Sequence, residues 1–221
     1  MISDKLNKRL EAITKVSLKG YKIRDLYRLM YNPELYYLAY QKIYANKGAI
    51  TKGIDDNTLD GMSKDRITNL IESLRKGIFQ PKAVRRTYIP KKNGKKRPLG
   101  IPTGDDKIVQ EVARILLERI YEPIFSDSSH GFRPNRSCHT ALWKIRKTWN
   151  GVKWLIDFDI KGYYDNINHK ILMQILEKRI EDKKFLRLIK EMLKAGYMEE
   201  LKMNRTYSGT IQGGIISYLQ F

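Results

Sequence analysis

The chain has 221 residues, which is enough for one good core or for two small lobes that share an interface. Its 43 Lys and Arg outnumber its 24 Asp and Glu and give a net charge of +19, so we expect a polyanionic partner, with nucleic acid ahead of an anionic membrane surface. No apolar run approaches the ~20 residues of a membrane span, and the single Cys138 excludes an internal disulfide framework and suits a reducing cytosol.

The N-terminal half is predicted to be mainly helical. Apolar residues at helical spacing predict helix over about residues 5–45, with a break at Asn32 and Pro33, and again over about 67–77. Residues 82–97 contain eight basic residues and no acid, and their alternation around an Asn-Gly pair predicts a β-hairpin. Residues 105–121 have one apolar stripe and predict an amphipathic helix.

The C-terminal half is predicted to begin with a strand. Residues 152–159 alternate, with Val152, Trp154, Ile156 and Phe158 on one face, and two helices are expected at about 169–180 and 183–195. The order of elements predicts an α+β fold in which helices outnumber strands.

A carboxylate at the end of this strand is the first candidate for chemistry. Residues 154–167 read WLIDFDIKGYYDNI, so an apolar strand ends in Asp159 and a glycine turn then brings two aromatic residues. A carboxylate in this position suits Mg²⁺, which prefers oxygen ligands and often keeps only one or two carboxylates plus substrate phosphates. Two other interpretations stay open at this point: an Asp-x-Asp pair of a nucleotide-sugar glycosyltransferase, and a strand end with solvated acids.

Three further segments favour contact with phosphates. Residues 85–102, RRTYIPKKNGKKRPLGIP, form a stiff basic hairpin that is able to hold a triphosphate or a nucleic-acid backbone, or is simply a solvated basic face. Residues 130–137, HGFRPNRS, present two arginines from a compact loop, which either contacts phosphate or packs between lobes. Residues 209–217, GTIQGGIIS, place paired glycines where a backbone is able to approach a ligand closely.

In this order and at these distances, the four segments resemble the successive sequence blocks of group II intron-encoded reverse transcriptases, or maturases. Residues 46–49, NKGA, are also similar to the N-terminal extension of that family, whose loop touches template. The resemblance implies a right-hand polymerase with helix-rich fingers, a β-hairpin and an incomplete ferredoxin-like palm sheet. It divides the chain into an N-terminal extension with the first fingers helices (1–80), the fingers with the basic hairpin (81–150) and a partial palm (151–221).

The same resemblance implies roles for individual residues. The family copies RNA into DNA by a two-metal in-line displacement with Mg²⁺, during intron splicing and retrohoming. On that pattern Asp159 is the first metal ligand, beside the carbonyl of Ile160, and Asp157 is the less favoured acid. Tyr164 corresponds to the steric gate that excludes a 2′-hydroxyl. The residues expected to hold the incoming dNTP are Lys91, Arg97 and Gln212, and those expected to contact RNA are Lys47, Arg85, Arg86, Arg133 and Arg136.

The sequence also departs from the family pattern. The family needs two more aspartates in an aromatic-x-Asp-Asp signature after Asp159, and none follows here, so we expect a truncated or degenerate reading frame that does not polymerise. Ile211 and Tyr218 replace two prolines of the last block, which puts the placement of Gln212 in doubt.

The partners implied by the resemblance are group II intron RNA, or an RNA template with a DNA primer, and dNTP, in the bacterial cytoplasm and near the nucleoid. No membrane partner is expected. Self-association as a homodimer or higher oligomer is expected from an unfinished palm. The alternatives are a non-catalytic RNA-binding splicing cofactor and another prokaryotic reverse transcriptase class, such as a retron, diversity-generating or CRISPR-associated enzyme.

Overall fold

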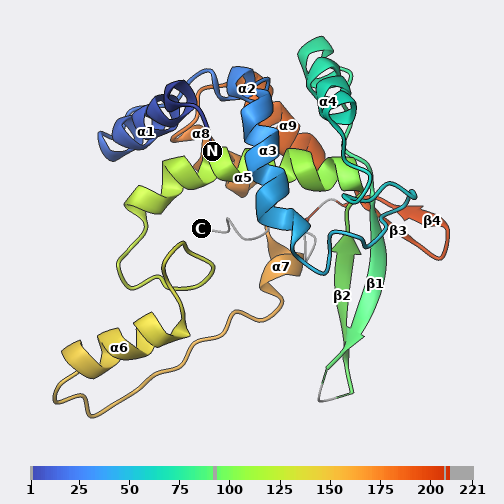
Figure 1. Ribbon diagram of the computed structural model, residues 1–221. Coiled ribbons are helices and arrows are strands. Elements are labelled where there is room, and N and C mark those ends of the chain that lie inside the picture. The colour runs from blue at the N-terminus through green and yellow to red at the C-terminus, as the bar shows by residue number, and fades with distance from the viewer. Residues whose placement is uncertain (1, 92–93, 207, 210–221) are drawn as a thin grey trace.

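A computed structural model describes residues 2–91, 94–206 and 208–209 and has the α+β architecture expected from the sequence (Figure 1). The described helices are α1 (Asp4–Leu18), α2 (Leu26–Leu29), α3 (Pro33–Tyr44), α4 (Lys64–Lys76), α5 (Gly104–Tyr121), a 3₁₀ turn (Glu122–Ile124), α6 (Cys138–Thr148), α7 (Tyr163–Asn166), α8 (His169–Glu177) and α9 (Lys183–Lys194). The described strands are β1 (Val84–Pro90), β2 (Lys96–Ile101), β3 (Tyr197–Glu199) and β4 (Lys202–Asn204).

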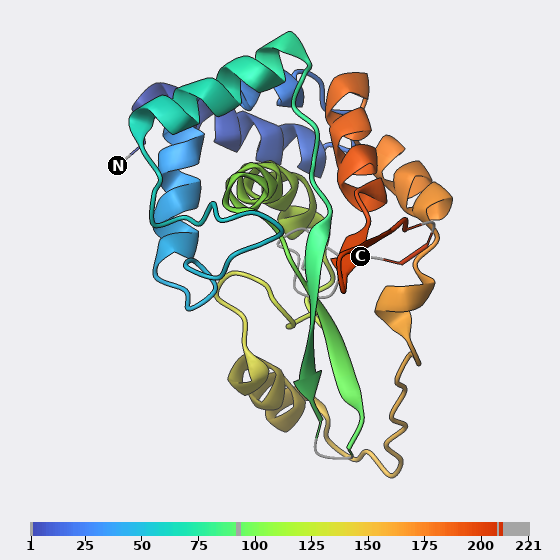
Figure 2. The same cartoon turned by 90° about the vertical axis from the view of Figure 1, so that its right-hand side faces the viewer.

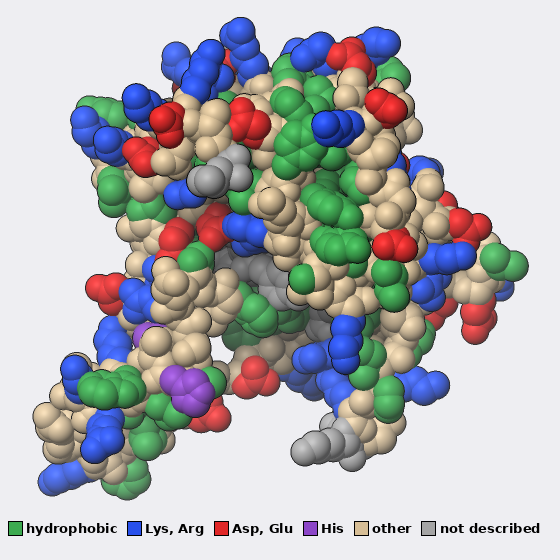
Figure 3. All heavy atoms as spheres, viewed as in Figure 1, with side chains coloured by type: hydrophobic (Ala, Val, Ile, Leu, Met, Phe, Trp, Pro, Cys, Tyr) green, Lys and Arg blue, Asp and Glu red, His purple; other side chains and the backbone are tan. Residues whose placement is uncertain are grey.

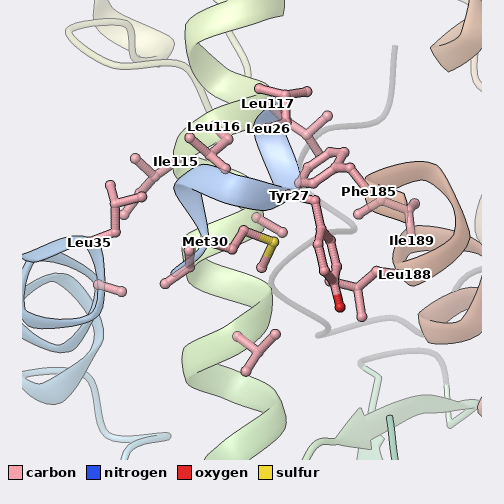
Figure 4. Packing of buried hydrophobic residues seen from close by; sticks show 14 of the residues in the cluster. Leu26, Tyr27, Met30, Leu35, Ile115, Leu116, Leu117, Phe185, Leu188 and Ile189 are labelled. Carbon is pink, nitrogen blue, oxygen red and sulfur yellow. The ribbon is translucent and has the colours of Figure 1, made fainter. Parts of the chain in front are cut away.

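Helix α5 is the centre of the core. It begins at the cap Thr103, whose hydroxyl accepts a hydrogen bond from the amide of Asp106 (3.2 Å), and most of its residues are buried, as expected of a helix surrounded by other helices. Apolar residues of α2, α3 and α9 pack around it; Figure 4 shows Leu26, Leu35 and Phe185 among them. None of the described helices is both long enough and apolar enough to cross a membrane.

A four-stranded sheet lies beside this core in the order β2-β1-β3-β4. The expected hairpin is confirmed as the antiparallel pair β1–β2, in which Ile89 lies opposite Arg97. A second hairpin, β3–β4, was not predicted, and it adds to β1 in parallel, with Val84 opposite Tyr197. The residue before β3 is Gly196, which has a φ of +77° and no room for a Cβ, because that atom would lie 2.3 Å from the carbonyl oxygen of Asn204.

The strand predicted at residues 152–159 is not formed. This segment is extended and exposed between α6 and α7, and no described strand pairs with it. A strand needs a neighbour for its backbone N–H and C=O groups, and the sequence pattern gives the alternation without giving that neighbour. Helix α6, which was also not predicted, lies apart from the helical core and has no buried residue (Figures 1 and 2). Among the described residues of the predicted palm part (151–221), β3 and β4 are the strands, and they lie beside the hairpin.

Candidate nucleic-acid interface

The basic hairpin has one face of cations. Ile89 pairs with Arg97, and the ladder continues past β1 because the amide of Lys91 donates to the carbonyl of Lys95 (2.7 Å). Since side chains alternate between the two faces of a strand, Lys91, Lys95 and Arg97 project from the same face, and all three are exposed. Figure 3 shows Lys and Arg side chains gathered along this hairpin beside a hollow in the molecular surface. The hairpin therefore holds cations in fixed relative positions, as an anion site requires.

The other face of the hairpin is used for packing within the sheet. The guanidinium of Arg86 lies over the ring of Tyr197, 3.8 Å from its centroid, which is a cation–π contact across the strands. The hydroxyl of Tyr88 donates to the carboxylate of Glu199. Two side chains of the basic block thus join the hairpin to β3, and the face that carries Lys91 and Arg97 points away from these contacts.

Two cations hold the loop of residues 46–53 from the inside. The ammonium of Lys107, on α5, donates to the carbonyls of Gly48 (2.9 Å) and Thr51 (2.5 Å), and burial is the first cause that lowers its pKa. The guanidinium of Arg85, on β1, donates to the carbonyls of Lys52 and Gly53. The loop therefore turns carbonyl oxygens inward, and Lys47 stays exposed on its outer side.

Beside this loop there is a cavity of about 500 Å³ that the sequence did not indicate. Its lining includes the charged residues Lys42, Lys107, Glu111 and Arg114. Phe132 also contributes to the lining, and 75% of this residue is exposed. Glu111 is almost fully buried and binds Arg114 through two hydrogen bonds (2.6 and 2.8 Å), so the acid in the wall is neutralised. Phe132 has a φ of +54°, which is uncommon for a residue other than glycine. In the sequence, the position of Phe132 between a glycine and an arginine was the only indication that it belongs to a candidate site.

The two loop arginines bind protein groups. Arg133 has a side chain that is 7% exposed, and it donates to both carboxylate oxygens of Glu122 and to the carbonyls of Ser126 and Ser129. Arg136 is more accessible and forms an ion pair with Asp127 at 3.0 Å. The structure thus gives Arg133 a role inside its own loop, as in the packing alternative that the sequence left open, and its contact with RNA stays a prediction.

The predicted catalytic residues lie on the exposed segment and on the short helix after it. Asp159 and Ile160 are exposed, and Tyr164, in α7, is partly buried with its ring edge-on to Tyr163. Gly162 makes the turn into α7 with a φ of +62°. Among the described residues, no hydrogen bond or ion pair joins Asp159 to Lys91 or Arg97, so the structure does not bring these groups into contact.

The donors available for Mg²⁺ fit in kind but not in number. Asp159 and Asp157 are exposed carboxylates, which are the hard oxygen ligands that Mg²⁺ prefers. Within the described part of the chain, no group of three or more acidic, His or Cys side chains lies close enough to hold a metal ion. Asp159 is thus able to supply one ligand for Mg²⁺, but the described residues do not form a complete magnesium site. Gln212, the predicted nucleotide-pocket residue, lies outside the described residues.

Comparison with known proteins gives a consistent result. The family described as "Reverse transcriptase (RNA-dependent DNA polymerase)" matches residues 89–221, which is more than half of the chain. The group II intron-encoded protein LtrA of Lactococcus lactis subsp. cremoris is 55% identical over 88% of the chain and 33% of its own length. An uncharacterised 91 kDa protein in the cob intron of Schizosaccharomyces pombe is 45% identical over 88% of the chain and 24% of its own length. Nuclear intron maturase 1, mitochondrial, of Arabidopsis thaliana is 32% identical over 67% of the chain and 17% of its own length. The chain therefore spans a third or less of these relatives.

Proposed function

The chain belongs to the reverse transcriptase family, within its group II intron-encoded branch, and we propose that its residues form the fingers and part of the palm of an RNA-directed DNA polymerase that acts as an intron maturase. In this proposal residues 1–80 are the N-terminal extension with the first fingers helices, 81–150 the fingers and 151–221 the palm part. The observation that supports it most directly is the cationic face of the β1–β2 hairpin, in the region where the family match begins.

We assign the hairpin to the incoming nucleotide. Lys91 and Arg97 project from one face, so together they are able to bind the phosphates of a dNTP, with Arg97 as a bidentate donor. The loop with Lys47 and the cavity beside Phe132 are assigned to the RNA template, because Lys47 is exposed and the cavity has Lys42 and Arg114 in its lining. Arg133 keeps a supporting role.

We assign the polymerising chemistry to Asp159 in a longer protein. Mg²⁺, when bound, supplies the positive charge that stabilises a phosphoryl group during transfer. Asp159 provides a carboxylate for it, Ile160 a carbonyl, and Tyr164 the ring that lies against the sugar. Because one acid cannot hold two ions, we propose that the 221 residues alone bind RNA and do not extend a primer. Asp159 is exposed, which favours RNA binding without catalysis as the function of these 221 residues by themselves.

The test is a graft. Residues 1–221 replace the corresponding part of the Lactococcus relative, and primer extension on an RNA template is measured with Mg²⁺ and dNTPs. We expect extension by the graft, its loss by at least about a thousandfold in Asp159→Ala, and unchanged RNA binding. Asp157→Ala, two residues away, is the matched control and should retain most activity. Activity that survives Asp159→Ala would refute the assignment of the metal ligand.

Self-association and a cytoplasmic, nucleoid-associated location also belong to the proposal. Helix α6 and the segment after it expose large apolar side chains, including Trp143 (59%), Trp154 (86%) and Phe158 (86%). Exposed apolar surface of this kind favours contact with another protein surface. Sedimentation of the chain at increasing concentration should show association; a concentration-independent monomer would exclude it.

A further inference from the structure

The outer face of helix α9 has a row of cations at helical spacing. The row consists of Lys183, Arg187, Lys190 and Lys194, at intervals of four, three and four residues. At 1.5 Å per residue these side chains form one stripe that is about 16 Å long. The opposite face of α9 is apolar and packs into the core, so the helix cannot turn this stripe inward. Glu191 is the only acid in the helix, and it pairs with Arg187 at 3.5 Å.

A concave surface lies beside this stripe. A groove of about 950 Å³ opens between α8, α9 and the segment after β4, and Figure 2 shows the two helices next to each other. Cations from two helices and from the segment after β4 line it: Lys170 of α8, Lys190 and Lys194 of α9, and Arg205. Among the lining residues that the structure describes, Glu177 is the only acid. The groove therefore concentrates positive charge from separate parts of the chain.

These cations have no acidic partner in the part of the chain that the structure describes. No described carboxylate lies within ion-pair distance of Lys170, Lys190 or Lys194, whereas the buried cations of the fingers are bound by carbonyls or by Glu111 and Glu122. Like charges one helical turn apart repel each other, so the pair Lys190 and Lys194 is destabilising in the free protein. An external polyanion relieves this repulsion.

We propose that this groove and stripe bind the phosphodiester backbone of a structured RNA, at a site separate from the hairpin. The length of the row suits an extended polyanion, since a small anion would need only one end of it. An anionic membrane fits less well, because an interfacial helix needs an apolar face beside its cations and that of α9 is already buried. The choice of RNA rests on the proposed function; the polyanion site itself does not.

The experiment compares three variants of the full chain by the salt dependence of binding to a stem-loop RNA. In the site variant, Lys170, Lys190 and Lys194 are replaced by Gln. We expect the slope of log affinity against log salt to fall by about 2 to 3, at roughly 0.7–0.9 for each phosphate that the protein no longer neutralises. The variant with Arg at the same three positions should keep the wild-type slope, which separates loss of charge from loss of structure.

The third variant removes the same charge elsewhere. Replacing Lys5, Lys8 and Lys15 of α1 by Gln should change the slope by less than about 1. An equal decrease in this control, or a wild-type slope in the site variant, would overturn the proposal. So would a site variant that loses binding to phosphatidylserine vesicles and keeps its RNA affinity. The failure of primer extension in the graft would leave these outcomes unaffected, so the two proposals fail separately.

Discussion

Asp106 offers a prediction in which the structure sets both sign and size. Its carboxylate is buried at the start of α5, where it accepts hydrogen bonds from the hydroxyl of Thr103 (2.7 Å) and from the amide of Lys82 (3.3 Å). Burial raises its pKa from 3.8 to about 6, and the nearby Asp105 contributes in the same direction, whereas both hydrogen bonds and the charge of Lys82 lower it. Asp106 thus connects the beginning of the hairpin to the central helix through a group that is costly to ionise.

The folded protein should therefore lose stability as Asp106 ionises. A carboxyl group whose pKa is higher in the folded state stabilises the fold below its unfolded pKa, and this contribution is lost as the pH rises through the folded value. The difference between 3.8 and about 6 corresponds to about 3 kcal/mol of unfolding free energy, lost between about pH 4 and pH 7. Asp106→Asn has no such loss, and its amide oxygen is still able to accept from Lys82.

The assay is urea unfolding of wild type and Asp106→Asn at several pH values from 4 to 7. The difference in unfolding free energy, variant minus wild type, should rise by about 3 kcal/mol across this range. The other titrating groups cancel in this difference. A difference for Asp106→Asn that stays constant or falls with pH would refute the reasoning.

Three further predictions concern groups inside the fold. Tyr36→Phe should raise the unfolding free energy by about 1 kcal/mol in urea titrations, because the buried hydroxyl has no hydrogen-bond partner among the described residues. Arg133→Leu should lower it by about 3 kcal/mol by leaving Glu122 without its partner, and adding Glu122→Leu should restore much of that loss. Lys107→Met should increase the rate of trypsin cleavage in the loop 46–53 several-fold, whereas Lys107→Arg should not, since it keeps a donor for the loop carbonyls.

The helices were predictable from the sequence because their apolar spacing repeats over several turns. Helices α4, α5 and α9 lie where the 3.6-residue pattern placed them, and β1 and β2 lie on either side of the Asn-Gly pair in the sequence. The predicted helix over residues 5–45 is interrupted earlier than expected, since α1 ends at Leu18 and the chain turns at Gly20 with a φ of +78°. A single glycine inside an apolar pattern did not reveal that turn.

The strands depended on information that a local pattern does not contain. Residues 152–159 have a clear alternation but no described neighbour, whereas the three-residue strands β3 and β4 have no visible alternation and are formed because β1 offers a free edge. The candidate site has the same limit. The sequence indicated that Lys91 and Arg97 are close, because one hairpin contains both. The position of Asp159 relative to them depends on tertiary structure, and that relation stays a prediction.

The division of labour among the basic residues follows from the backbone around them. Irregular loops leave carbonyl oxygens without partners, and these must find a donor when they are buried. Arg85, Lys107 and Arg133 all lie next to such loops, and all three donate to loop carbonyls. The backbones of strands and helices satisfy most of their own carbonyls, so the exposed cations of α9 are not needed as donors to them. Because a sequence motif counts charges without showing where the carbonyls are, it does not separate Arg133, which binds its own loop, from a cation that is left to solvent. We therefore expect RNA affinity to depend on the cations of α9 more than on Arg133.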